Sequence, residues 1–312
     1  MSKKLISIVI PCYNEDDNIL LMINKIRSFM LSINDIYDFE IIIIDNDSTD
    51  SSVKIIKSEC ELDLKIKLIV NSRNFGWIKS PYYGLLQAKG DAVVYLAADF
   101  QDPPELILDF IKKWEEGYKI AIGVKAQSEE SPIMFAIRKL YYNIIDKISN
   151  NKLYKNFTGF GLYDKRIIEI LNQFDDPYPY FRGLISEVGF KKAVINFTQP
   201  KRKRGISASN FYALYDVAML GITSYSKVPL RIATFAGFIM SAVSLIVALV
   251  YLILKLTFWY SFPAGYAPTV IAIFFFASVQ LLFTGILGEY IGSIHTIVQK
   301  RPLVIEKERV NF

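Results

Sequence analysis

The chain has 312 residues, a hydrophobic fraction of 52% and a modest formal net charge of +5. This length allows one large domain with a shorter appended segment, and the sequence contains no recognisable nucleic-acid-binding module. Its two cysteines, Cys12 and Cys60, form no C-x-x-C pair, which argues against a disulfide framework or a zinc site. The only histidine is His295, so the first 290 residues hold no histidine general base.

Short apolar runs alternate with amphipathic segments over the first 125 residues. Strands are predicted at Leu5–Ile10, Phe39–Ile44, Lys65–Val70, Ala92–Ala97 and Lys119–Val124, and helices at Asn18–Leu31, Ser51–Cys60, Pro81–Lys89 and from Glu105 to about Glu116. This alternation is typical of an α/β fold with a doubly wound, mostly parallel sheet. A further helix is predicted from Ile133 to about Ile148, and residues 150–200 are mixed.

Three polar motifs follow strands of this predicted sheet. They are PCYNE (Pro11–Glu15), DNDSTD (Asp45–Asp50) and DFQDPPE (Asp99–Glu105). Ligands of such sheets bind at the carboxyl ends of the strands, so we expect the three motifs to converge on one crevice.

The third motif carries the clearest chemistry. Asp99 and Asp102, with the amide of Gln101 between them, leave the end of a buried strand. Mg²⁺ and Mn²⁺ prefer oxygen ligands of this kind and bridge them to phosphate oxygens. The alternative is a simple Asp–Pro turn before a helix, but the presence of the other two motifs in this order favours a metal site.

Two apolar stretches near the C-terminus, Ile232–Leu254 and Ala267–Leu287, contain no charged residue. Each exceeds the roughly 20 residues that cross a bilayer, whereas core helices rarely run so long without a charge. Basic residues flank the outer ends: Lys227, Arg231, Lys300 and Arg301. Positive flanks predict a hairpin with both ends in the cytoplasm. The basic run Lys201–Arg204 and the moderately apolar segment Ser209–Ser226, which suits a helix at the membrane surface, precede it.

The predicted organisation has four parts. Residues 1–200 form the cytoplasmic α/β domain, and 201–231 hold the basic loop and the juxtamembrane helix. Residues 232–292 form the transmembrane hairpin, and 293–312 a cytoplasmic tail.

Taken together in order, these motifs resemble the inverting family-2 glycosyltransferases with the GT-A fold. More specifically, the chain resembles polyprenyl-phosphate glycosyltransferases, the group of the bactoprenol glucosyltransferases and dolichyl-phosphate mannose synthase. Four further segments carry the resemblance: SRNFG (Ser72–Gly76), YFRGLISEVGF (Tyr180–Phe190), RKRGIS (Arg202–Ser207) and ILGEYIG (Ile286–Gly292).

The resemblance implies roles for individual residues. The nucleoside would be held by Pro11, Tyr13, Glu15 and Asp45, and the divalent cation, Mg²⁺ or Mn²⁺, by Asp99 and Gln101, with Asp102 as a further ligand. Phosphates would be bound by Arg138, Arg182, Arg202, Lys203 and Ser207. Catalysis would rest on Asp99, Gln101 and Arg202, with Glu187 as a candidate base or orienting group.

The chain also departs from the family pattern at several positions. Ala97 stands where an Asp-x-Asp motif would have its first carboxylate, and Asp47 replaces a common glycine. Gly159 and Gly161 stand where many relatives carry Asp and Arg. These departures bear on the donor sugar and the phosphate contacts more than on the reaction class.

By this resemblance the chain transfers one sugar, with inversion, from a nucleotide-sugar to a polyprenyl phosphate at the cytoplasmic face of the inner (plasma) membrane. UDP-glucose and undecaprenyl phosphate are the expected substrates, the lipid bilayer is a partner, and a homo-oligomer is left open. Two alternatives are a processive polysaccharide synthase and a non-catalytic nucleotide-binding scaffold. The first normally needs more spans and a Gln-x-x-Arg-Trp motif, whereas Ala97 motivates the second.

Overall fold

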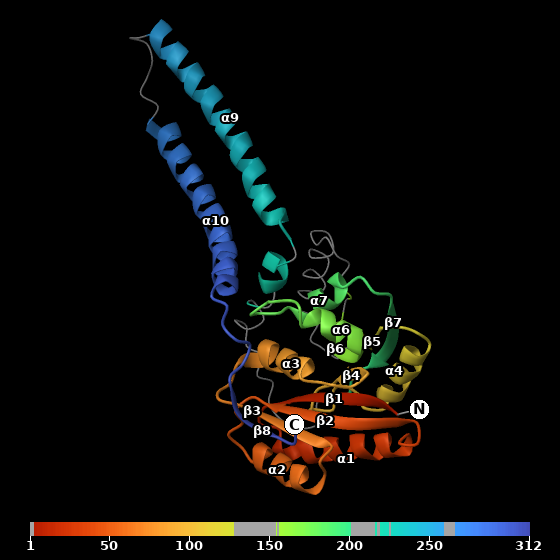
Figure 1. The fold of residues 1–312 in the computed structure, drawn as a ribbon. Helices are drawn as coiled ribbons and strands as arrows, with labels where there is room; N and C mark the ends of the chain where they lie inside the picture. The colour runs from red at the N-terminus through yellow and green to blue at the C-terminus, as the bar shows by residue number, and fades with distance from the viewer. Residues whose placement is uncertain are drawn as a thin grey trace.

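The computed structural model describes residues 3–127, 154, 156–200, 216, 219–224, 226–258 and 266–312. In this part of the chain, one sheet has helices on both faces, and two long helices project from it (Figure 1). The strands are β1 (Lys4–Cys12), β2 (Tyr37–Asp45), β3 (Ile66–Asn71), β4 (Ala92–Tyr95), β5 (Ile120–Gln127), β6 (Phe157–Asp164), β7 (Lys192–Thr198) and β8 (Glu306–Val310). The helices are α1 (Asp16–Ser32), α2 (Ser52–Leu62), α3 (Gly76–Leu86), α4 (Leu106–Glu115), α6 (Lys165–Leu171), α7 (Phe181–Glu187), α9 (Val228–Thr257) and α10 (Tyr266–Val298).

The sheet has the strand order β7-β5-β6-β4-β1-β2-β3-β8. Its centre, β4-β1-β2-β3, is parallel throughout, and only β6 and β8 run against the other strands. The register of β1 with β2 runs unbroken from Lys4 opposite Tyr37 to Cys12 opposite Asp45. The first two polar motifs therefore leave the sheet side by side, and the α/β fold predicted from the sequence is confirmed.

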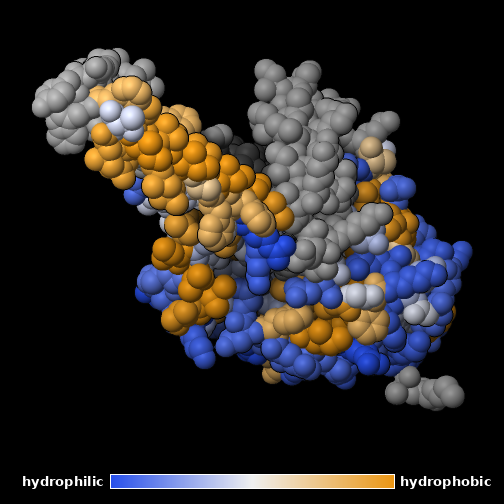
Figure 2. Space-filling view, turned by 90° about the horizontal axis from the view of Figure 1, so that it is seen from above, coloured by the Kyte–Doolittle hydropathy of each residue, from blue (hydrophilic) through white to orange (hydrophobic). Residues whose placement is uncertain are grey.

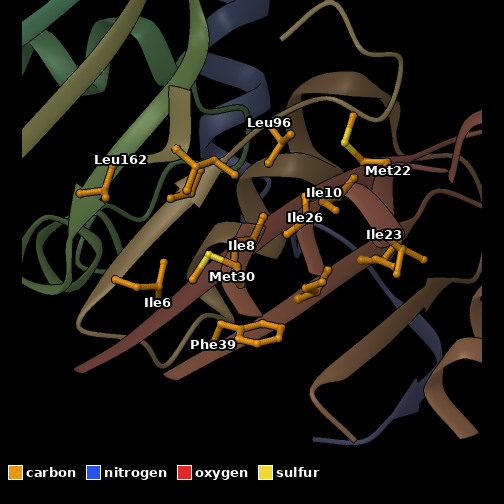
Figure 3. Close-up of a cluster of buried hydrophobic side chains, with 14 of the residues drawn as sticks. Ile6, Ile8, Ile10, Met22, Ile23, Ile26, Met30, Phe39, Leu96 and Leu162 are labelled. Carbon is orange, nitrogen blue, oxygen red and sulfur yellow. The ribbon is translucent and has the colours of Figure 1, made fainter. Parts of the chain in front are cut away.

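Apolar side chains pack on both faces of this sheet. Along β1, Ile6, Ile8 and Ile10 point to one face, because successive side chains of a strand alternate. Helix α1 covers that face with residues that share one side of a helix, including Met22 and Ile26 (Figure 3). In Figure 1, α1 and α2 lie on one side of the sheet and α3, α6 and α7 on the other. Each central strand is thus buried on both faces, which explains its continuous apolar run.

Helix α3 begins five residues earlier than the sequence predicts. The prediction took Pro81 as the helix start, whereas the helix begins at Gly76 and Pro81 lies within it. The side-chain oxygen of Asn74 accepts a hydrogen bond of 2.8 Å from Gly76 N, and this contact satisfies one of the free amides at the helix N-terminus. Residues 150–200, which the sequence left as mixed, supply β6, α6, α7 and β7. The predicted helix over residues 133–148, and most of that over 209–226, lie outside the described residues.

The last residues of the chain return to the sheet. Strand β8 pairs antiparallel with β3, and the side chain of Asn311 donates to the carbonyls of Cys60 and Ile66, at 2.8 Å each. Lys57 and Glu308 form an ion pair of 2.6 Å between α2 and β8. Of the segment predicted as a tail, residues 293–298 thus belong to α10, and Glu306–Val310 forms a strand of the α/β domain.

Helices α9 and α10 lie next to each other and carry exposed apolar surface along their length, which Figure 2 shows in orange. Each contains a stretch long and apolar enough to cross a membrane, Val228–Leu254 and Ala272–Val298, and neither stretch is buried within the protein. The second stretch extends further along the chain than the predicted Ala267–Leu287. Where α10 meets the start of α9, the hydroxyl of Tyr290 donates to the carbonyl of Ser226 at 2.6 Å.

A buried ion pair links β2 to β3 on the face of the sheet that α3 covers. Glu40 is 4% exposed, and its carboxylate lies 2.6 Å from Lys67 Nζ on the neighbouring strand. The other carboxylate oxygen accepts hydrogen bonds from the hydroxyl of Ser7 at 2.5 Å and from Lys89 N at 3.2 Å. The charge of Glu40 is therefore fully paired within the sheet.

We expect Glu40→Ala to destabilise the protein by about 3 kcal/mol, because removing one partner leaves the largely buried ammonium of Lys67 unpaired. This corresponds to a fall in Tm of roughly 5 °C. The matched control is Glu116→Ala, which removes a more exposed ion pair with Lys113 and costs less than about 1 kcal/mol. Equal falls in Tm for the two purified variants would contradict this assignment.

Candidate active site

The three polar motifs meet at the carboxyl edge of the parallel strands. Asn46 N donates to the carbonyl of Cys12 at 2.9 Å, and Tyr95 at the end of β4 lies opposite Val9 of β1. Each motif contains one residue other than glycine with a left-handed backbone: Asn14 (φ 54°), Asp47 (φ 65°) and Phe100 (φ 59°). Such conformations are costly, above all for Phe, and they cluster at functional sites. All three turns therefore bear local strain at the same edge.

Hydrogen bonds join the first two turns. Asn14 N donates to the hydroxyl of Ser48 at 2.9 Å, and the side-chain oxygen of Asn14 accepts from Thr49 N at 2.8 Å. Glu15 N donates to the hydroxyl of Ser52 at 2.9 Å. The two turns thus form one rigid unit, with polar side chains at the rim of the sheet.

The four residues predicted to hold a nucleoside belong to this unit. Asp45 is fully buried, and it accepts hydrogen bonds from Ser48 N (2.9 Å) and the Ser48 hydroxyl (2.5 Å). Burial raises the pKa of the Asp45 carboxyl above its usual range. Glu15 is 9% exposed and accepts a bond of 2.7 Å from the side chain of Asn18, whereas Tyr13 is 41% exposed. Pro11, at the end of β1, is half-buried.

The sequence analysis missed Asn46, which connects the second turn to the SRNFG loop. Its side-chain oxygen accepts from Phe75 N (2.9 Å) and the Asn71 amide (3.0 Å), and its own amide donates to Asn74 (2.9 Å). The sequence did offer a signal for this role: Asn46 follows one predicted strand, and Asn71 and Asn74 follow the next. Asn46 thereby fixes the loop after β3 against the second turn.

The two carboxylates of the third motif differ in their exposure to solvent. Asp99 is partly exposed and accepts from Gln101 N at 3.1 Å, as in an Asx turn. Asp102 is 5% exposed and accepts from Ala97 N at 3.1 Å. Burial raises the pKa of Asp102 to about 6, and the negative charge of Asp99 adds to this shift. Asp99 and Gln101 are therefore partly exposed, whereas Asp102 braces the turn from inside.

Two basic side chains, those of Arg182 and Lys125, act on this end of the site. Arg182 of α7 lies close enough to the phenol of Tyr95 to lower its pKa, whereas burial, Asp102 and Asp99 all raise that pKa. Lys125, at the end of β5, favours ionisation of Asp102 and so lowers its pKa. The structure thus brings Arg182, predicted as a phosphate ligand, to the cavity that Tyr95 lines at the end of β4. Lys125 was missed, although a lysine directly after a predicted buried strand is a visible signal.

The remaining predicted residues lie elsewhere or outside the described part of the chain. Glu187 lines a cavity of 820 Å³ between α7 and α10, together with Asp176 and Glu289. Four predicted phosphate ligands lie outside the described residues: Arg138, Arg202, Lys203 and Ser207. Their roles, like that of Glu187, stay predictions.

The two glycines of β6 are fixed by their surroundings. Gly159 has φ +109°, a conformation that side chains rarely adopt, and a Cβ there would lie 3.3 Å from the ring of Tyr95. A Cβ on Gly161 would lie 2.4 Å from the carbonyl oxygen of Ala121 on β5. Neither position has room for Asp or Arg in this backbone, so the departure from the family pattern is built into the strand pairing.

The sequence matches the profile described as Glycosyl transferase family 2 over residues 7–171, more than half of the chain. The chain belongs to glycosyltransferase family 2. It is 32% identical to an uncharacterised glycosyltransferase of Synechocystis sp., with 96% of this chain and 94% of the relative covered. It is 31% identical to a prophage-derived bactoprenol glucosyl transferase of Shigella flexneri, with 97% of each covered. A prophage bactoprenol glucosyl transferase homologue of Escherichia coli is 30% identical, with 97% of this chain and 98% of the relative covered.

Solved structures show a weaker likeness. Mannosyl-3-phosphoglycerate synthase of Rubrobacter xylanophilus is 16% identical with a TM-score of 0.46, covering 69% of this glycosyltransferase and 71% of that chain. Residues 1–349 of TarS from S. aureus are 16% identical with a TM-score of 0.44, and the match covers 72% of this glycosyltransferase and 66% of the TarS chain. The assignment of this glycosyltransferase to its family rests on the sequence matches.

The burial of Asp45 predicts a pH dependence of stability. Its pKa is raised in the folded enzyme, so the folded state holds the proton more tightly, and stability falls as pH rises above the unfolded value of about 3.9. Asp45→Asn has the same shape and keeps an acceptor for Ser48 but does not titrate. We therefore expect the Tm of wild type, relative to that of Asp45→Asn, to fall as pH rises above about 4.

The control for this experiment is Asp109→Asn, an exposed carboxylate on α4. Its Tm difference from wild type should stay nearly constant over the same range. A constant difference for Asp45→Asn as well would show that Asp45 is not desolvated.

Proposed function

We propose that this glycosyltransferase moves a single sugar from a nucleotide-sugar, UDP-glucose, to a polyprenyl phosphate such as undecaprenyl phosphate at the cytoplasmic face of the membrane. The observation that carries the proposal is the joint occurrence of a carboxylate-lined edge in a family-2 domain and two exposed apolar helices in one chain. Relatives named bactoprenol glucosyl transferases, matched over nearly their full length, support the lipid acceptor.

The nucleoside side of the donor fits the rigid unit of the first two turns. Its base and ribose are uncharged and polar, and such groups are bound by a few fixed hydrogen-bonding groups beside an aromatic or apolar surface. Glu15 offers a carboxylate whose position is set by Asn18, and the buried Asp45 shapes the second turn through Ser48. The exposed ring of Tyr13 offers a face for the base.

The donor diphosphate fits the Asp99 turn. Mg²⁺ or Mn²⁺ is commonly held by one or two carboxylates and the substrate's phosphates, so the partly exposed Asp99, with Gln101, is a sufficient protein contribution. No group of three or more His, Cys, Asp or Glu side chains that would hold a metal by itself occurs among the described residues. When bound, the cation would neutralise charge on the departing diphosphate. Arg182 would bind a phosphate on the same side.

The acceptor's chemistry relaxes the need for a general base. A phosphate monoester has its second pKa near 6, so its oxygen is already anionic at pH 7 and needs no proton removed. The enzyme's main task is then to hold two mutually repelling anions in line. This is consistent with Gly159, where the backbone leaves no room for a carboxylate. Glu187, on the cavity beside α10, is not needed as a base.

Helix α7 contributes residues to two cavities. A small cavity of 80 Å³ is lined by Tyr95 and Arg182 at the site, and by Phe181 of α7. The other side of α7 contributes Leu184 to the cavity of 820 Å³, whose far wall is α10. An acceptor whose tail stays beside α10 would place its head group near α7, which carries Arg182.

Substituting Asp99 and Asp102 one at a time tests the metal role of the third motif. We expect Asp99→Asn to lower turnover at least about hundredfold, because it weakens charge neutralisation at the leaving group. Asp102→Asn should cost less than about tenfold, since an amide oxygen can still accept from Ala97 N. Turnover is measured with labelled UDP-glucose and undecaprenyl phosphate, with and without EDTA. Full activity in EDTA would refute the metal role, and equal losses would make Asp102 a ligand.

Cysteine labelling tests the orientation of the helices. Ser261→Cys, in the segment between α9 and α10, should react with an impermeant maleimide on intact cells, whereas Lys307→Cys on β8 should react only after lysis. The native Cys12 and Cys60 are buried and give little background. The opposite pattern would overturn both the orientation and a cytoplasmic donor.

A further inference from the structure

Three basic residues gather where the second apolar helix joins the α/β domain. Arg73 belongs to the loop after β3, Lys79 to the start of α3, and Arg301 to the segment after α10. Backbone pairing brings these segments together, because Ser72 N donates to the carbonyl of Ile305 at 2.9 Å. The β3–β8 pairing continues this contact into the sheet. The cluster is therefore fixed by the fold and not by flexible side chains alone.

The positive charges of this cluster are not neutralised within the described part of the protein. None of the three cations has an ion pair within 4 Å there. The Arg73 guanidinium lies 4.1 Å from the ring centre of Phe75, and the Lys79 ammonium 5.5 Å from that of Tyr178. Burial, together with Arg73 and Arg301, lowers the pKa of Lys79, and Asp176 only partly opposes this. Like charges held together in this way favour an anion between them.

The position of the cluster matches the depth of lipid head groups. Arg301 follows the last residue of α10, Val298, by one short turn. Basic residues at the end of a spanning helix lie at the membrane surface.

We propose that Arg73, Lys79 and Arg301 bind the phosphate of an anionic phospholipid of the bilayer, at the edge of the cavity between α7 and α10, where Lys79 lies against Tyr178. The proposal rests on the membrane hairpin of the proposed function. Guanidinium groups can hold a phosphate with two parallel hydrogen bonds, and an ammonium adds a point charge. Because Asn46 holds the Arg73 loop, through Phe75 N and Asn74, the lipid also braces the loop beside the nucleoside site.

The test counts lipids retained by the full-length protein in detergent, by native mass spectrometry with mixed phosphatidylglycerol and phosphatidylcholine. We expect Lys79→Gln/Arg301→Gln to bind phosphatidylglycerol on the order of thirtyfold more weakly, because each basic residue near an anionic surface contributes about a factor of five. The matched control, Lys112→Gln/Lys165→Gln, removes the same charge from exposed positions on α4 and α6 and should retain phosphatidylglycerol as wild type does. Unchanged Tm values show that both variants fold.

A second measurement distinguishes the phosphate of a lipid from the phosphates of the nucleotide donor. Isothermal titration with UDP should give the same Kd for wild type and Lys79→Gln/Arg301→Gln. Weaker UDP binding with unchanged phosphatidylglycerol retention would overturn the proposal and assign the cluster to the donor. Equal phosphatidylglycerol retention by both double variants would also overturn it. Lipid retention requires no sugar transfer, so failure of the proposed reaction and failure of this site give different results.

Discussion

Parallel pairing of β1 with both β2 and β4 is the constraint on which the site depends. Because parallel strands share one carboxyl edge, the turns after Cys12, Asp45 and Tyr95 must meet there. The buried pair of Ser7 and Glu40, directly opposite each other on β1 and β2, opposes a slip of one residue, which would leave both side chains without this partner. The positions of the carboxylates at this edge are thus a consequence of strand pairing.

The site combines rigid and strained elements at this edge. Hydrogen bonds from Ser48 and Asn46 lock the turns, while Asp47 and Phe100 adopt left-handed backbones. Strain of this kind persists only where the surrounding structure determines it, and the buried Asp102, bonded to Ala97 N, is one such support. The arrangement leaves Asp99 partly exposed, without a neighbouring carboxylate at position 97.

Strand β8 gives the domain a second connection to the apolar helices. The chain leaves α10, turns at Lys300 (φ 45°) and re-enters the sheet within a few residues. Val304 is buried, and β8 pairs with β3 beside the SRNFG loop. So short a connection limits how far the site can move from the end of α10, as the proposed transfer to a lipid acceptor requires.

The sequence by itself determined the α/β class, the first five strands, the two apolar helices and the motif turns. These features depend on local patterns of apolar, polar and charged residues, which are visible along the chain. Only the tertiary structure showed that Asp102 is buried, that Lys125 approaches Asp102 and Arg182 approaches Tyr95, and that β8 completes the sheet. Such facts depend on pairing between residues far apart in the chain. For the same reason, the tight contact at Gly161 became visible only once β5 lay beside β6.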